Sequence, residues 1–297
     1  MNQLWSAILA PGLFHSKEVG YALVIGLIVA ALSGMIGVFV VIRGQSFVGH
    51  VLTDIGAAGG SGSFLIGLNA WYGFVSFGVL AGAGVELLGN RARNRDVATG
   101  IILSFAMGLG ALFLYFDTNT GNNANASMLV LFGSIFVIHS SLLPIVASVG
   151  GATIIALLIL YRPLLLCSIS PEVARSRGIP VRFVSIAFMI LLALAVENGS
   201  LVIGSLLSTA LLIGPAATAI RITTKVGMAS ILSAVIGMLA TSIGIVLAYD
   251  SYTWLPTHRG WPVSFFIAVL IFLFYLLSRL WPSTTTKTRK VEPREAL

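Results

Sequence analysis

Residues 20–42 read GYALVIGLIVAALSGMIGVFVVI, an apolar run without a charged side chain. At a rise of about 1.5 Å per residue, a helix of this length crosses a hydrocarbon core roughly 30 Å thick. Similar runs recur along the chain and predict spans near residues 20–42, 48–68, 70–90, 96–116, 143–162, 183–197, 201–220, 226–249 and 261–281. The sequence therefore predicts an all-α, polytopic membrane bundle of nine helices, within a range of eight to ten.

The composition excludes several other classes of protein. Of the 297 residues, 57% are hydrophobic and 9% are charged, whereas a soluble domain has about 25% charged residues. A soluble fold with so few charges could not cover its own surface. The single cysteine, Cys167, excludes a disulfide framework and a cluster of thiolate ligands. No spaced glycine pattern precedes a Lys-Ser/Thr pair, so we expect no nucleotide-binding loop. The net charge of +7 matters for where the basic residues lie relative to the membrane, and no nucleic-acid partner is expected.

Lysine and arginine are unequally divided between the two sides that alternating spans define. One side holds only Lys17 and Arg259, and the other holds Arg43, Arg91, Arg93, Arg95, Arg162, Arg175, Arg177, Arg182, Arg221, Lys225, Arg279, Lys287, Arg289, Lys290 and Arg294. Cytoplasmic loops carry the excess of positive charge. We therefore expect the N-terminus outside, the C-terminus in the cytoplasm and the polar loop 117–127 outside.

The two ends of the chain carry further expectations. Residues 1–16 lack a basic segment followed by a small-residue cleavage site, so the first apolar run is expected to be a retained span. Residues 1–282 are interpreted as one transmembrane domain. Residues 283–297 are interpreted as a polar cytoplasmic tail, which we expect to be disordered.

One pair of ionisable side chains lies within a predicted span. His50 and Asp54 are four residues apart, so on a helix they share one face with about 6 Å of axial rise between them. Imidazole nitrogen and carboxylate oxygen are ligands that suit zinc or manganese, which makes the pair a candidate metal site. A polar pair that only fixes helix packing explains the spacing equally well, and a proton relay would use the same residue types.

Other ionisable residues favour structural roles. Glu197 is expected to end the sixth span, at the membrane interface. His15, His139 and His258 are expected in solvated segments outside the membrane. The four histidines stand far apart in sequence and form no His-Glu-x-x-His motif, so an intramembrane zinc peptidase is disfavoured.

Residues 170–180, SPEVARSRGIP, have the pattern of a short capped helix. Ser170 is suited to the N-cap, Pro171 and Glu172 to the first turn, and Gly178 to the C-terminal end before Pro180. The predicted topology places this segment in the cytoplasm. A charged two-turn helix there suits docking of a soluble partner, and a solvated connector is the alternative.

The sequence resembles, over nearly its whole length, the membrane permease of bacterial ABC importers of the zinc/manganese type. The most specific motifs are YRPL at 161–164, PEVAR at 171–175, GIP at 178–180 and STALLIGPAATA at 208–219. Weaker motifs are GVFVVIR at 37–43, SFVG at 46–49, ATGI at 98–101 and LFGSI at 131–135. The resemblance implies a type II ABC importer permease fold for residues 1–282.

The resemblance also implies roles for particular residues. The family has Gly-Asp after its first span and a His four residues beyond the Asp, on a helix that lines the translocation path. This chain has His50 and Asp54 in that register, with the two ligand types exchanged. The family's short cytoplasmic helix, which receives the ATPase, matches 171–178. The docking residues implied are Pro171, Glu172, Ala174, Arg175 and Gly178.

The implied assembly is a homodimer of permeases with two cytoplasmic ABC ATPase subunits and an extracytoplasmic metal-binding protein. It would lie in the bacterial inner membrane and import zinc, manganese or iron, with no permanently bound cofactor. The chain itself would not be an enzyme, because ATP would be hydrolysed by the partner subunit.

Two further functions remain open from the sequence. An ion-coupled secondary carrier could use His50 and Asp54 as a proton relay, and it predicts an internal repeat with interrupted helices. We find no convincing repeat. An ABC permease for a larger metal chelate predicts a wide cavity without ionic ligands on its axis.

Overall fold

A computed structural model describes residues 17–88, 92–120, 130–133, 135, 143–252, 254 and 260–280. All regular structure in these residues is helical, which confirms the predicted all-α class. The helices are α2 (Lys17–Ile42), α3 (Ser46–Leu65), α4 (Ala70–Leu88), α5 (Ala92–Thr120), α7 (Leu143–Ile169), α8 (Pro171–Ser176), α9 (Val181–Ile203), α10 (Ser205–Ile222), α11 (Val226–Ser251) and α12 (Val263–Leu280). The expectations for His15, His139, His258, residues 121–127 and the tail 283–297 lie outside the described residues.

Each predicted span coincides with one long helix. Within the described ranges, seven helices are long and apolar enough to cross a membrane, namely Val19–Ile42, Ala70–Leu87, Thr99–Asp117, Leu143–Ile169, Val181–Ile203, Val226–Ser251 and Val263–Leu280. These helices make the chain a multi-pass membrane protein. α10 offers a shorter apolar segment, Leu207–Ile222, and α3 is rich in glycine, serine and ionisable residues. The count of nine spans therefore stays a prediction.

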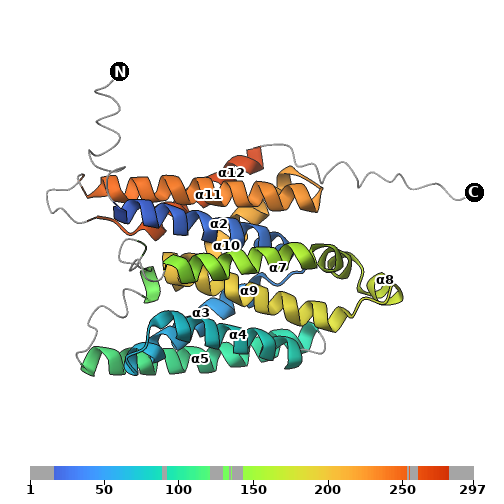
Figure 1. Ribbon diagram of the computed structural model, residues 1–297, viewed down its shortest axis with the longest axis horizontal. Coiled ribbons are helices and arrows are strands. Elements are labelled where there is room, and N and C mark those ends of the chain that lie inside the picture. The colour runs from blue at the N-terminus through green and yellow to red at the C-terminus, as the bar shows by residue number, and fades with distance from the viewer. Residues whose placement is uncertain are drawn as a thin grey trace, which may run out of the picture.

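The helices form three layers, as Figure 1 shows. α2 and α11 lie side by side on one face with α12 behind them, while α3, α4 and α5 form the opposite face. α7, α9 and α10 lie between these groups, and α8 projects from one end of the bundle. α9 is central, because it contacts α2, α3, α4, α7 and α10.

Glycines allow α3 and α4 to pack closely. A Cβ added to Gly73 on α4 would meet the carbonyl oxygen of Gly59 on α3, and one added to Gly60 would lie 2.5 Å from the ring of Phe74. Small residues in the second predicted span therefore serve helix packing. Gly67 is different, because its φ of 72° places it in the turn that follows α3.

The predicted end of the sixth span at Glu197 is wrong, because α9 continues to Ile203. Asn198 does not interrupt the helix, since its Nδ2 donates to the carbonyl oxygen of Leu194 at 2.9 Å. The chain breaks instead at Gly204, whose φ is 95°. Glu197 consequently lies within α9, and its side chain is fully buried inside the bundle.

The fifth span is also longer than predicted. Its predicted end was residue 162, but α7 runs through Pro163 to Ile169. The short helix after it is confirmed as α8. Ser170 has the extended backbone of an N-cap residue, with φ −148° and ψ 96°, although its side chain makes no capping bond. Gly178, with φ 76°, lies beyond its C-terminal end.

Candidate functional site

The turn that leads into α3 is anchored to α9. Gly44, with φ 64°, lets the chain reverse direction after α2. Arg43 Nη2 donates to Ser185 Oγ at 2.8 Å, and the guanidinium carbon lies 4.9 Å from the ring centre of Phe188. These contacts fix the start of α3, and with it the helix that carries the predicted metal pair.

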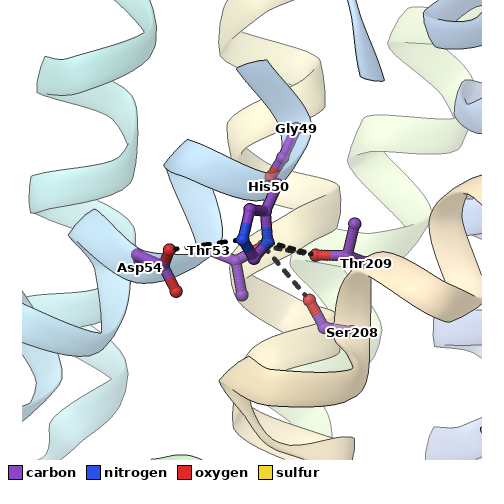
Figure 2. A network of polar contacts seen from close by, with 6 residues as sticks. All are labelled: Gly49, His50, Thr53, Asp54, Ser208 and Thr209. Carbon is purple, nitrogen blue, oxygen red and sulfur yellow. Dashed lines mark hydrogen bonds and ion pairs between the residues drawn. The ribbon is translucent and has the colours of Figure 1, made fainter. Parts of the chain in front are cut away.

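His50 and Asp54 project from the same side of α3, as their spacing predicts (Figure 2). His50 Nε2 lies 3.7 Å from Asp54 Oδ2, and the two side chains are 49% and 21% exposed. A distance of about 2.1 Å is typical of zinc with such ligands. If an ion lay at that distance from both atoms, the Nε2–ion–Oδ2 angle would be about 120°. Among the described residues no group of three or more His, Cys, Asp or Glu side chains could hold a metal. The described part of one chain therefore supplies two ligands.

Hydroxyl groups from α10 complete the polar surroundings of His50. Its Nδ1 lies 3.3 Å from Thr209 Oγ1 (Figure 2). Thr53 Oγ1, one turn along α3, lies 3.4 Å from Ser208 Oγ and 3.5 Å from Thr209 Oγ1. Sequence reasoning missed both α10 residues as part of the site. They stand in the motif at 208–219, but nothing in the sequence shows that this motif begins beside His50.

Glu197 places a third ionisable group near the pair. Its side chain has no exposed surface, and its carboxyl occupies the space over two glycines, since a Cβ on Gly56 or Gly78 would meet its oxygens. Neither carboxyl oxygen has a hydrogen-bond partner in the described part of the chain. Asp54 is near enough to interact with it electrostatically.

The predicted docking residues lie on α8 and just beyond it. Pro171, Glu172, Arg175 and Gly178 are exposed at the end of the bundle where α8 projects (Figure 1). Ala174 is fully buried and belongs to an apolar cluster that includes residues of α2, α7 and α9. Ala174 therefore attaches α8 to the bundle, while its charged neighbours remain accessible.

Comparison with known proteins gives consistent matches. The manganese transport system membrane protein MntC of Listeria innocua is 29% identical over 239 residues, which cover 80% of this chain and 84% of MntC. The manganese import system permease protein ScaB of Streptococcus parasanguinis is 29% identical over 254 residues, covering 83% of this chain and 89% of ScaB.

A solved structure matches as well. The chain superimposes on PsaBC from Streptococcus pneumoniae, solved in complex with a Fab, with a TM-score of 0.78 and 26% identity. The match covers 93% of this chain and 96% of that one. The model of the ABC 3 transport family matches residues 17–279, a range that runs from the start of α2 almost to the end of α12. The chain therefore belongs to the ABC 3 transport family.

Proposed function

We propose that this chain is the membrane-spanning subunit of an ATP-driven importer that moves manganese into the cytoplasm. Membership of the ABC 3 transport family makes it a transport subunit and not an enzyme. Manganese is the metal in the names of MntC and ScaB. The observation that carries the proposal is the His50–Asp54 pair, with 3.7 Å between Nε2 and Oδ2. Zinc and iron accept the same ligand types, so the test below includes zinc.

The pair would bind the transported ion as substrate. Both side chains must be deprotonated at the atoms that bind the ion. The ion must also lose water molecules as it gains these two ligands. The exposure of His50, 49% of its side chain, leaves room for further ligands on the ion.

A second copy of the chain would supply those ligands. A two-fold axis beside α3 would bring two His50–Asp54 pairs together and give four ligands, enough for a four-coordinate ion. The same contact would cover the polar surface that a single chain exposes at this point of the bundle. The proposed importer is therefore a homodimer of permease subunits.

The remaining parts of the importer follow from the sequence and its resemblance. The chain has no nucleotide-binding motif, so we assign ATP hydrolysis to a separate ABC ATPase that docks on α8. An extracytoplasmic metal-binding protein would deliver the ion. The N-terminus would lie outside and the C-terminus in the cytoplasm, with residues 1–282 forming the permease domain and 283–297 the tail.

The rival functions fit less well. A secondary carrier does not belong to an ABC family, which is the family this chain matches over residues 17–279. A permease for a bulky chelate has no use for ionisable ligands on its path, whereas His50 and Asp54 lie together on one face of α3.

Uptake of radiolabelled manganese and zinc into vesicles that carry the complete importer tests this function. We expect His50→Ala and Asp54→Ala each to reduce manganese uptake at least tenfold, with normal amounts of protein in the membrane. Ser76→Ala is the matched control, because Ser76 is exposed on α4 and bonds only within its own helix. Full manganese uptake by both Ala variants would show that the pair is a structural contact. Uptake of zinc in place of manganese would reject the choice of metal.

A further inference from the structure

The hydroxyl groups beside His50 can be assigned donor and acceptor roles one by one. A serine or threonine hydroxyl donates one hydrogen, while its oxygen accepts. Thr53 Oγ1 donates to the carbonyl oxygen of Gly49 at 3.0 Å. Ser200 Oγ donates to the carbonyl oxygen of Val196, also at 3.0 Å. The oxygens of Thr53 and Ser200 are therefore left as acceptors for hydroxyls from α10.

The two α10 hydroxyls match these two acceptors. Ser208 Oγ lies 3.2 Å from Ser200 Oγ and 3.4 Å from Thr53 Oγ1, so its single hydrogen goes to the nearer Ser200. Thr209 Oγ1 lies 3.3 Å from His50 Nδ1 and 3.5 Å from Thr53 Oγ1, so its hydrogen has two acceptors in reach, and the tautomer of His50 decides between them. When that hydrogen is directed to Thr53, the Thr209 oxygen is left as an acceptor, 3.3 Å from His50 Nδ1, for a hydrogen on that nitrogen (Figure 2).

We propose that Thr209 is a positioning residue that selects the metal-binding nitrogen of His50. By accepting a hydrogen bond from Nδ1, Thr209 holds the ring hydrogen there and leaves Nε2 with a free lone pair. Nε2 is the nitrogen that lies 3.7 Å from Asp54 Oδ2. Both atoms then face the gap as acceptors, and a bound cation satisfies both. This inference rests on the proposed function of the pair, and it assigns Thr209 a role without making it a ligand.

Substitutions on α10 separate positioning from general packing. Thr209→Val keeps the shape of the side chain but removes the acceptor, so the ring hydrogen can move to Nε2 and bond to Asp54 in place of the ion. We expect the manganese concentration for half-maximal uptake to rise about 10- to 100-fold, and Thr209→Ser to restore it. Thr218→Val is the matched control on the same helix, because Thr218 Oγ1 donates only to the carbonyl oxygen of Gly214, at 2.8 Å.

The tautomer of His50 can be measured directly, and a change in packing alone would not alter it. The permease, with His15, His139 and His258 replaced by Gln, is labelled with ¹⁵N-histidine and assembled with unlabelled partner subunits into the complete importer. It is studied metal-free by ¹⁵N NMR at a pH where the imidazole is neutral. We expect His50 to carry its hydrogen on Nδ1, to shift toward Nε2 in Thr209→Val, and to keep Nδ1–H in Thr209→Ser and Thr218→Val.

Two results would overturn the proposal. One is a His50 that carries its hydrogen on Nε2 in the otherwise unchanged permease. The other is a Thr209→Val variant with an unchanged tautomer, whatever its uptake. If the proposed function of the pair is wrong, His50→Ala will retain full manganese uptake. The tautomer measurement decides the role of Thr209 independently of that result.

Discussion

At the scale of single residues, the buried carboxyl group of Glu197 depends on two glycines that leave space for it. Its carboxyl fits between α3 and α4 because Gly56 and Gly78 lack a Cβ that would occupy the same space. Gly78→Ala should therefore overpack this contact, and overpacking typically costs about 1–3 kcal/mol. We expect the thermal unfolding midpoint of the purified protein to fall by several degrees.

A glycine elsewhere on the same helix provides the comparison for this prediction. A Cβ on Gly84 would meet nothing within 4 Å, so Gly84→Ala should leave the midpoint unchanged or raise it slightly. Combining Gly78→Ala with Glu197→Ala should cost less than the sum of the two single changes, since the methyl group then replaces the removed carboxyl. Equal effects of the two glycine variants would contradict this account of the contact.

The candidate site was predictable only where it is local in sequence. His50 and Asp54 are one helical turn apart, so helix geometry alone brings them together. Thr209 is 159 positions from His50, and the contact between them depends on the packing of α10 beside α3. Glu197 was misplaced for a related reason, because the polar residues after it suggested a helix end, whereas Asn198 bonds back into α9.

At the scale of elements, α8 combines one buried residue with exposed charged residues. Ala174 is buried against α7 and α9, while Glu172 and Arg175 are exposed on the same short helix. Glu172→Arg together with Arg175→Glu should therefore leave α8 attached and remove charge complementarity to a docked ATPase. We expect the ATPase to be lost from the purified complex, while the permease still inserts in the membrane.

The control for α8 is a charge reversal at another exposed turn. Lys225 precedes α11 and is exposed, so Lys225→Glu should retain the ATPase at the level of the unchanged protein. Retention of the ATPase by the α8 double variant would remove the docking role and leave the helix as a connector. The existence of this helix was predictable, because proline, glutamate and glycine define its ends locally. A partner for it would be a property of the assembly, which the local sequence does not encode.

At the scale of the whole molecule, the number of crossings decides which ends of the helices face the cytoplasm. The apolar runs predicted the order of the helices, because burial in lipid demands long apolar segments. They do not settle the count, since α3 is rich in glycine and serine and the apolar segment of α10, Leu207–Ile222, is shorter than the seven candidate spans. The basic residues provide an independent criterion, because fifteen of seventeen fall on one side only if nine spans alternate.

Single-cysteine labelling in intact cells tests that topology. In a Cys167→Ser background, Asn69→Cys in the exposed turn between α3 and α4 should react with an impermeant thiol reagent added outside. Arg177→Cys, exposed just after α8, should react only once the membrane is opened. These two sites are separated by three predicted crossings, so they must lie on opposite sides if α4, α5 and α7 each span the membrane. Labelling of both from the same side would reject the alternation on which the orientation depends, and with it the placement of α8 where a cytoplasmic ATPase could reach it.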